Sequence, residues 1–279
     1  MTKPVGKRGY SHPELLAETD WLASRLSDPN IRVVDSRSDK DYASGHIPGA
    51  IHLDGYTFRG LRTGSEMPEP EAFARLIGAI GIDENTPIVV YDAGGPPTAG
   101  MVAWAFLYYG HPDSRLLDGG LKKWTAEGLP LSSDTPAHQP RDFTARPVES
   151  VYCNLNQAKA SVHDDGVVFW DTRSLGEFDG TTKGWNAPPR LGHLPGAVLL
   201  DQDELFDAND GTLKPAADLT ALLADKGITP ETAVVTYCGG GARGGLAAFV
   251  LKILGYDRAS NYAGSFNEWS RQPDTQVDR

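Results

Sequence analysis

The stretch Val167-Val-Phe-Trp-Asp-Thr-Arg173 has a counterpart 136 residues earlier, Ile31-Arg-Val-Val-Asp-Ser-Arg37. Three further pairs follow in the same order, at separations of 147, 146 and 145 residues. They match Gly45–Ile51 with Gly192–Val198, Pro87–Asp92 with Ala233–Cys238, and Leu117–Trp124 with Tyr262–Trp269. Four ordered pairs indicate a tandem duplication of one domain of about 130 residues. The change from 136 to 147 places an 11-residue insertion in the second copy, between Arg173 and Gly192.

Short apolar runs alternate with stretches of helical spacing in each copy. The nearly continuous runs predict parallel strands buried on both faces, at Ile31–Val34, Ile88–Tyr91, Val167–Trp170 and Ala233–Tyr237. Helical spacing predicts helices at Glu71–Ile80, Gly94–Tyr109, Leu219–Asp225 and Gly239–Leu254. The alternation therefore predicts two tandem α/β domains, each with a mainly parallel central sheet and helices on both faces.

The boundaries between the two copies follow from a change in composition. Residues 135–150 hold several prolines among polar residues and have no apolar period, which predicts an extended linker over the surface. We therefore place the first domain at residues 1–134 and the second at residues 151–279.

Composition and charge narrow the classes of function. The 279 residues carry a net charge of −11, of which −5 falls on residues 1–140 (13 basic, 18 acidic) and −6 on the rest (13 basic, 19 acidic). An evenly acidic chain without a basic stripe argues against binding to nucleic acid or anionic membranes. No apolar run is long enough to span a bilayer. Two cysteines exclude a disulfide framework, so we expect a cytoplasmic protein.

The two copies differ after their matching apolar runs, where Asp92 stands in the first and Cys238 in the second. The second copy reads Cys238-Gly-Gly-Gly-Ala-Arg243-Gly-Gly, which predicts a thiol at the carboxyl end of a strand, followed by a glycine-rich loop and a helix. Backbone N–H groups of such a loop and the helix N-terminus bind anions and lower the pKa of a thiol. We therefore predict that Cys238 is a nucleophile and that Arg243 binds an anionic substrate.

The ordered motifs resemble those of the two-domain rhodaneses, a family of sulfurtransferases. The resemblance rests on the Asp-x-Arg and Gly-His-x-Pro-Gly-Ala motifs of both copies, on the six residues from Cys238 to Arg243, and on the closing Asn261–Trp269. It runs from about Trp21 to Trp269. In the family, the six-residue loop begins with the catalytic Cys and the first domain has lost that Cys, as at Asp92 here.

The resemblance implies a reaction in two displacements. The thiolate of Cys238 attacks a small anionic sulfur donor such as thiosulfate and keeps its sulfur as a persulfide. An acceptor, cyanide or another thiol, then takes this sulfur. No cofactor is implied, and the seven histidines show no metal-ligand spacing.

The expected substrate-binding residues lie around this thiol. The loop positions Gly239, Gly240, Gly241 and Ala242 offer backbone N–H groups. The resemblance adds Arg173 of the Asp-x-Arg motif, and Arg190 of the insertion as a weaker candidate. The first-copy equivalent of Arg173, which is Arg37, has no thiol beside it and is predicted to be structural.

Other residues invite a catalytic reading that the duplication argues against. The histidines at 46 and 193 occur in both copies, including the copy without a thiol, and are therefore predicted to shape a turn. By the same reasoning Trp124 and Trp269 are predicted to lie in the core. Cys153 is far in sequence from the loop and is expected to be inert.

Several alternatives stay open at this point. The donor could be 3-mercaptopyruvate, whose users in the family typically have Cys-Gly-Ser-Gly-Val-Thr; Arg243 favours thiosulfate. The protein could also carry a persulfide to a protein partner without turning over small molecules. Phosphatase relatives have five residues between Cys and Arg, whereas this loop has four, which disfavours that activity. The physiological acceptor and the oligomeric state do not follow from the sequence.

Overall fold

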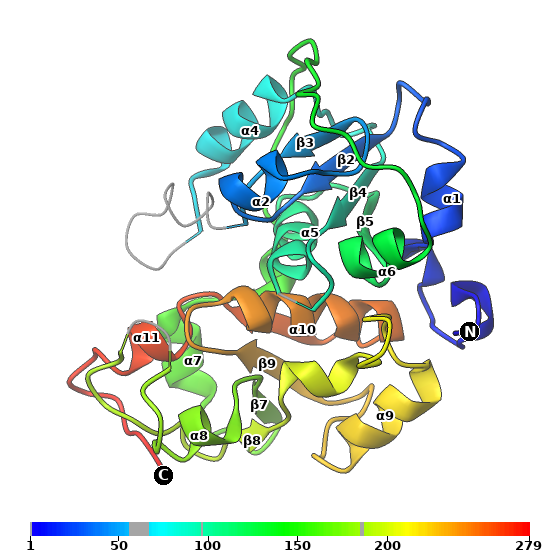
Figure 1. Cartoon of the computed structure of the whole chain (residues 1–279). Coiled ribbons are helices and arrows are strands. Elements are labelled where there is room, and N and C mark those ends of the chain that lie inside the picture. The colour runs from blue at the N-terminus through cyan, green and yellow to red at the C-terminus, as the bar shows by residue number, and fades with distance from the viewer. Residues whose placement is uncertain (1, 56–66, 96, 185–186) are drawn as a thin grey trace.

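The computed structural model describes residues 2–55, 67–95, 97–184 and 187–279. Two five-stranded sheets form its centre, and every pairing between their strands is parallel. The strand order is β1-β5-β4-β2-β3 in the first sheet and β6-β10-β9-β7-β8 in the second. Each strand of the first sheet thus has an equivalent in the second sheet whose number is five higher, such as β4 and β9. This order confirms the predicted duplicated α/β fold (Figure 1).

The predicted strands and helices are present with small shifts at their ends. The first sheet consists of β1 (Leu16–Ala17), β2 (Arg32–Asp35), β3 (Ala50–His52), β4 (Ile88–Tyr91) and β5 (Ser114–Leu117). The second consists of β6 (Tyr152–Cys153), β7 (Val167–Asp171), β8 (Val198–Leu199), β9 (Ala233–Tyr237) and β10 (Ala259–Tyr262). The α-helices are α1 (Thr19–Ala23), α2 (Asp39–Ala43), α4 (Pro70–Ala79), α5 (Thr98–Tyr108), α6 (Gly120–Ala126), α7 (Leu155–Ser161), α8 (Leu175–Phe178), α9 (Ala216–Ala224), α10 (Ala242–Leu254) and α11 (Ser265–Trp269). Short 3₁₀ turns lie at Val5–Lys7, Pro13–Leu15, Glu149–Val151 and Gln202–Leu205.

Both faces of the first sheet are buried, as the apolar runs predict. Alternate residues of a strand point to opposite faces, so Val33 and Val89 pack in one apolar cluster while Val34 and Val90 pack in another. The second cluster also holds residues of the second domain, among them Trp170 and Val234. The two domains therefore share one apolar core.

Helices α5 and α10 form the contact between the domains and lie side by side between the two sheets (Figure 1). Nearly every residue of both helices is buried, as expected for helices covered on all sides. Glycines allow the close approach: a Cβ at Gly100 would lie 2.2 Å from Cδ1 of Leu246, and one at Gly245 would lie 3.3 Å from Cα of Met101.

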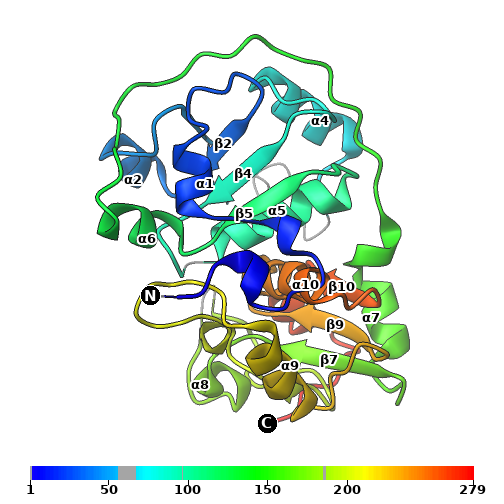
Figure 2. The same ribbon diagram turned by 90° about the vertical axis from the view of Figure 1, so that its right-hand side faces the viewer.

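Residues 133–148 contain no helix or strand and arch over the first domain before the chain enters the second (Figure 2). Their backbone is fastened to that domain, since Arg141 N–H donates to the carbonyl of Gly78 at 2.9 Å and Val148 N–H to that of Tyr108 at 2.7 Å. The chain start also crosses between domains. Arg8 forms a buried ion pair with Asp118 and donates to the carbonyl of Leu213 at 2.7 Å. Within the described residues, no helix has the length and apolar character to cross a bilayer.

The tight contact between α5 and α10 leads to a test of stability. Gly100→Ala should lower the free energy of unfolding by about 1–3 kcal/mol, because the added methyl group meets Leu246 in a packed interface. Urea unfolding followed by circular dichroism measures the change. Gly6→Ala is the control, since a methyl group there meets no atom within 4 Å. Equal stability of the two variants would contradict this view of the interface.

Candidate active site

Cys238 follows β9 directly and lies where the carboxyl end of the strand turns into α10. Its side chain is buried, with 2% of the residue exposed, and its Sγ accepts a hydrogen bond from the N–H of Gly241 at 3.0 Å. Only glycine fits position 241, because its φ is +97° and a Cβ would lie 2.5 Å from the carbonyl oxygen of Ala263. The glycine at 241 thus brings a backbone donor to the sulfur.

The surroundings of Cys238 favour the thiolate. Burial alone would raise the pKa of Cys238, but the charge of Arg243 and three backbone N–H groups outweigh burial and lower this pKa. The N–H groups belong to Gly244, Gly240 and Gly241. A thiolate population at neutral pH is what a nucleophilic cysteine requires.

The turn after β10 fastens the loop from the other side. The N–H of Phe266 donates to the carbonyl of Cys238, and that of Asn267 to the carbonyl of Gly239, both at 2.9 Å. Ser265 Oγ accepts from the N–H of Cys238 at 3.1 Å and donates to the carbonyl of Tyr262 at 2.8 Å. The turn therefore holds Cys238 in place by hydrogen bonds to the backbone of the loop.

Ser265 is a residue that our sequence reasoning missed. Its φ of +54° is rare for a residue with a side chain, and Gly120 has the same φ of +54° at the equivalent place in the first domain. The second domain thus has a serine, whose hydroxyl binds the backbone of Cys238, where the first domain has glycine. The available signal was this serine in place of glycine within Asn261–Trp269.

Arg243 lies at the start of α10, and its guanidinium is paired. Its Nη1 donates to Oε2 of Glu177 at 2.7 Å and its Nη2 to Oε1 at 2.8 Å. This two-point ion pair and the nearby thiolate raise the pKa of Arg243 against the effect of burial. Arg243 therefore acts on the thiol through its charge, and a carboxylate that we did not predict balances that charge.

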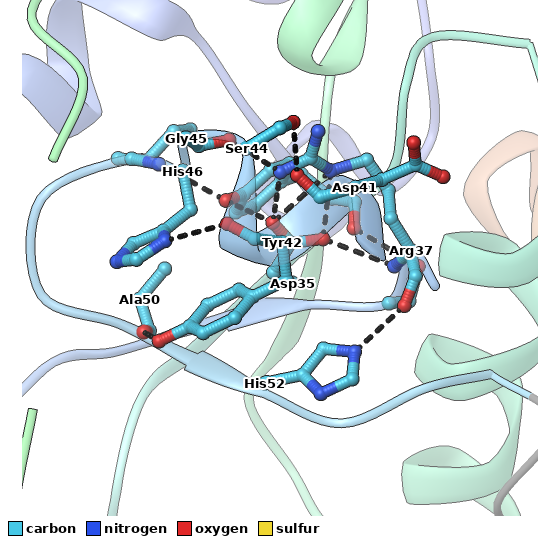
Figure 3. Close-up of polar contacts among 12 residues, drawn as sticks. Asp35, Arg37, Asp41, Tyr42, Ser44, Gly45, His46, Ala50 and His52 are labelled. Carbon is cyan, nitrogen blue, oxygen red and sulfur yellow. Dashed lines mark hydrogen bonds and ion pairs between the residues drawn. The ribbon is translucent and has the colours of Figure 1, made fainter. Parts of the chain in front are cut away.

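Arg173 is buried and makes its contacts within the protein. It binds Asp171 at 2.6–3.0 Å and the carbonyl of Gly192 at 2.7 Å, and its guanidinium lies 4.3 Å from the ring centre of Phe266. Arg37 repeats the arrangement in the first domain, on Asp35 and the carbonyl of Gly45 (Figure 3). Because the domain without a thiol has the same contacts, they favour a structural role for Arg173 over the expected binding of substrate.

Arg190 also turns toward the protein. It donates to backbone carbonyls of the segment that leaves α11, including those of Ser270 at 2.8 Å and Gln272 at 2.6 Å. These contacts hold the C-terminal segment in place. Two residues of its insertion, 185 and 186, lie outside the described residues.

The remaining loop positions present backbone to the site. Gly239 has no side chain, and a Cβ there would lie 3.6 Å from Nη2 of Arg243 and 3.9 Å from Oε1 of Glu177. The N–H groups of Gly240 and Gly241 serve the thiol, and Ala242 is the buried first residue of α10. Among the residues that the structure describes, no three His, Cys, Asp or Glu side chains gather as metal ligands would.

A hollow of about 800 Å³ lies near α8, and neither Cys238 nor the pair of Arg243 and Glu177 belongs to its wall. Leu175, two residues before Glu177, and Asp201 line it. Further charged side chains line it, the carboxylates of Asp203, Glu204 and Asp207 and the ammonium groups of Lys214 and Lys226.

The model for the rhodanese-like domain matches this chain twice, at residues 18–127 and 154–272. The chain belongs to the rhodanese family. It is 34% identical to the sulfur carrier protein TtuD of Thermus thermophilus, over 94% of this chain and 95% of the relative. It is also 34% identical to a thiosulfate sulfurtransferase of Corynebacterium glutamicum, over 93% and 89% of the two chains.

Solved structures agree with this assignment. The anaerobic ergothioneine biosynthesis enzyme of Chlorobium limicola superposes with a TM-score of 0.86 at 25% identity, over 96% of this chain and 71% of that one. Two rhodanese domains and relatives with sulfurtransferase names make this chain an enzyme of the sulfurtransferase class.

In the first rhodanese domain, Asp92 fills the place of the thiol. Its Oδ1 accepts from the N–H of Gly94 at 2.9 Å and its Oδ2 from the N–H of Ala99 at 3.1 Å. The carboxylate of Asp92 is thus itself the anion that the N–H groups of this turn bind. Burial raises the pKa of Asp92 to about 6, although these two hydrogen bonds act against the rise.

The residues that the duplication marked as structural make structural contacts. His46 and His193 each bind backbone carbonyls and stack on a ring of α2 or α8, as Figure 3 shows for His46 on Tyr42. Trp124 and Trp269 are buried in the core, as predicted. Burial and the charge of Glu268 raise the pKa of Cys153 to about 12, in keeping with an inert thiol.

The raised pKa of Asp92 predicts how stability depends on pH. Between its unfolded value near 3.8 and about 6, the folded state binds the proton more tightly, so this group lowers the free energy of unfolding as pH rises through that range. Relative to wild type, Asp92→Asn should therefore gain up to ~3 kcal/mol between pH 4 and pH 7. Urea unfolding at both pH values tests this; a difference that does not change with pH would contradict it.

The lowered pKa of Cys238 predicts its reactivity. In a Cys153→Ser background, the rate of alkylation by iodoacetamide should rise with a midpoint below 8.5, the pKa of an ordinary thiol. In a Cys238→Ser background, Cys153 should stay unreactive at neutral pH. A midpoint for Cys238 at or above 8.5 would mean that the loop does not favour the thiolate.

Proposed function

We propose that this rhodanese transfers a sulfane sulfur from thiosulfate to a thiophilic acceptor through a persulfide on Cys238. The observation that carries the proposal is the buried thiol of Cys238, with its Sγ 3.0 Å from the N–H of Gly241 and its pKa lowered. The relative from Corynebacterium glutamicum carries the name of this activity.

The proposed reaction balances without a cofactor. The Cys238 thiolate attacks the outer sulfur of thiosulfate, an S–S bond forms, and the original S–S bond breaks as sulfite leaves with its electron pair. The outer sulfur of the persulfide is then attacked by cyanide or a thiolate. The new bond yields thiocyanate or a new persulfide, and the Cys238 thiolate leaves with the electron pair of the broken bond.

The loop suits both anionic states of the sulfur. The N–H groups of Gly240 and Gly241, which favour the resting thiolate, also lie in place to stabilise the negative charge of a persulfide. The cradle is built from backbone, so it needs no rearrangement between the two displacements. Binding of the donor by Gly239, Ala242 and Arg243 forms part of this proposal.

A second candidate function is that of a persulfide carrier for a protein partner. The relative named as a sulfur carrier protein, 34% identical over nearly the whole chain, favours it. The two functions differ in one measurable respect. An enzyme turns over thiosulfate steadily with a small acceptor, whereas a carrier accumulates a stable persulfide until its partner is added. We expect a cytoplasmic location for either function.

The proposed function predicts that activity depends on one cysteine. Cys238→Ser should lower kcat/KM for thiosulfate by at least about 10³-fold, because no thiolate is left to accept the sulfur. Thiocyanate formation from thiosulfate and cyanide measures the loss. Cys153→Ser should keep the activity, since Cys153 lies elsewhere with its pKa raised.

The same assay with 3-mercaptopyruvate decides the donor. A higher kcat/KM for thiosulfate is expected, and a preference for 3-mercaptopyruvate would replace the proposed donor. Full activity of the Cys238→Ser variant with either donor would overturn the assignment of the nucleophile.

A further inference from the structure

We propose that Glu177 is a specificity-determining residue of this site: its carboxylate balances the charge of Arg243 and so limits the preference for a doubly charged donor over a singly charged one. The inference rests on the proposed function, since it concerns how the same thiol selects its donor. It starts from an ion pair that lies next to Gly239, the residue that follows the thiol in the chain.

The pair is fixed by two charge-assisted hydrogen bonds. Each terminal nitrogen of Arg243 donates to one carboxylate oxygen of Glu177, at 2.7 and 2.8 Å. The side chains are 22% and 10% exposed, so little water screens them. Burial alone would raise the pKa of Glu177, but Arg243 and Ser174 lower it, and the carboxylate is therefore charged at neutral pH.

The fold holds Glu177 independently of Arg243. It is the third residue of α8, and its Oε2 accepts from the N–H of Ser174 at 3.3 Å and from the hydroxyl of Ser174 at 3.2 Å. A Cβ at Gly184 would lie 2.5 Å from Oε1, so the insertion of the second copy packs its backbone against the carboxylate. The capping contacts orient Glu177, and the insertion shields it from water.

The pair lies directly over the reactive loop. Both Nη2 of Arg243 and Oε1 of Glu177 lie within 4 Å of where a Cβ at Gly239 would be, next to the nucleophile in the chain. Arg243 is also the charged group that acts most strongly on the Cys238 thiol. A donor that reaches the sulfur therefore experiences the sum of the two charges, which is close to zero.

The first domain has no thiol, so its equivalent residues show which contacts of Glu177 do not depend on one. The residue equivalent to Glu177 is Asp41, 136 residues earlier, and the residue equivalent to Arg243 is Pro97, 146 residues earlier. Asp41 keeps the capping contact with Ser38 but is exposed. The cap is thus common to both domains, whereas the partly buried ion pair belongs to the domain with the thiol.

The charge of the site affects donors in proportion to their own charge. Thiosulfate carries two negative charges and 3-mercaptopyruvate one. Removing the charge of Glu177 adds one positive unit near the sulfur, and by Coulomb's law the dianion gains twice what the monoanion gains. Glutamine keeps the shape and can still cap α8, so Glu177→Gln changes little besides the charge.

The test compares kcat/KM for both donors in wild type and in Glu177→Gln. The ratio of thiosulfate to 3-mercaptopyruvate should rise about 5–10-fold in the variant, and the increase should shrink at high salt. Asp41→Asn is the matched control, which removes a capping carboxylate from the other domain and should leave the ratio unchanged. The alkylation midpoint of Cys238 should move to lower pH in Glu177→Gln only.

Each outcome separates the inference from the proposed function. An unchanged ratio, or an equal loss with both donors, would overturn the role of Glu177 and leave it a positioning residue for Arg243. If wild type turns over neither donor, the proposed function fails. The alkylation midpoint then still decides about Glu177, since a shift to lower pH in Glu177→Gln supports the charge balance and an unchanged midpoint overturns it.

Discussion

Backbone N–H groups that point into the turn between a central strand and the following helix need an acceptor once the turn is buried. This constraint applies twice in the chain. After β4 the acceptor is the carboxylate of Asp92, and after β9 it is the sulfur of Cys238. The N–H groups of the turn therefore lower the pKa of the thiol together with the charge of Arg243, which is the largest single lowering effect. A turn that is built to hold an anion favours the thiolate form of a cysteine in that place.

The first domain supports this turn from outside. The helix α10 that begins at Ala242 packs along α5, with Gly100 and Gly245 at the closest approaches, and both helices are buried between the two sheets. The chain start adds the buried ion pair of Arg8 with Asp118, which also reaches the carbonyl of Leu213. The domain that carries Asp92 thus fixes the position of the helix whose first turn faces the thiol. The aspartate at 92 is compatible with that structural role.

Much of this architecture could be predicted because the duplication places the same motifs in the same order in both halves of the chain. The nearly continuous apolar runs at β2, β4, β7 and β9 were predicted, whereas the other six strands were missed. Of these, β1, β6 and β8 have only two residues each, and β5 and β10 include polar residues. The thiol and its glycine loop were also predictable, since those residues act through their own backbone. The partners of Arg173, Arg190 and Arg243 were not, because a guanidinium is placed by whichever carbonyls and carboxylates the tertiary fold brings to it. The spacing of Ser174 and Glu177 predicts a capping box. Nothing in the sequence, however, pairs Glu177 with Arg243.

The placement of these three arginines changes how an acidic protein of net charge −11 holds an anion. Arg173 is neutralised by Asp171, Arg243 by Glu177, and Arg190 is occupied by carbonyl groups. In the proposed reaction the attraction for a donor therefore comes chiefly from the aligned N–H groups of the loop, which act over a few ångströms. A site of this kind barely attracts anions from a distance but stabilises them at the sulfur. In the proposed reaction the thiolate and the persulfide carry the same single charge, so the same N–H groups serve both, and the protein does not have to change its charge between the two displacements.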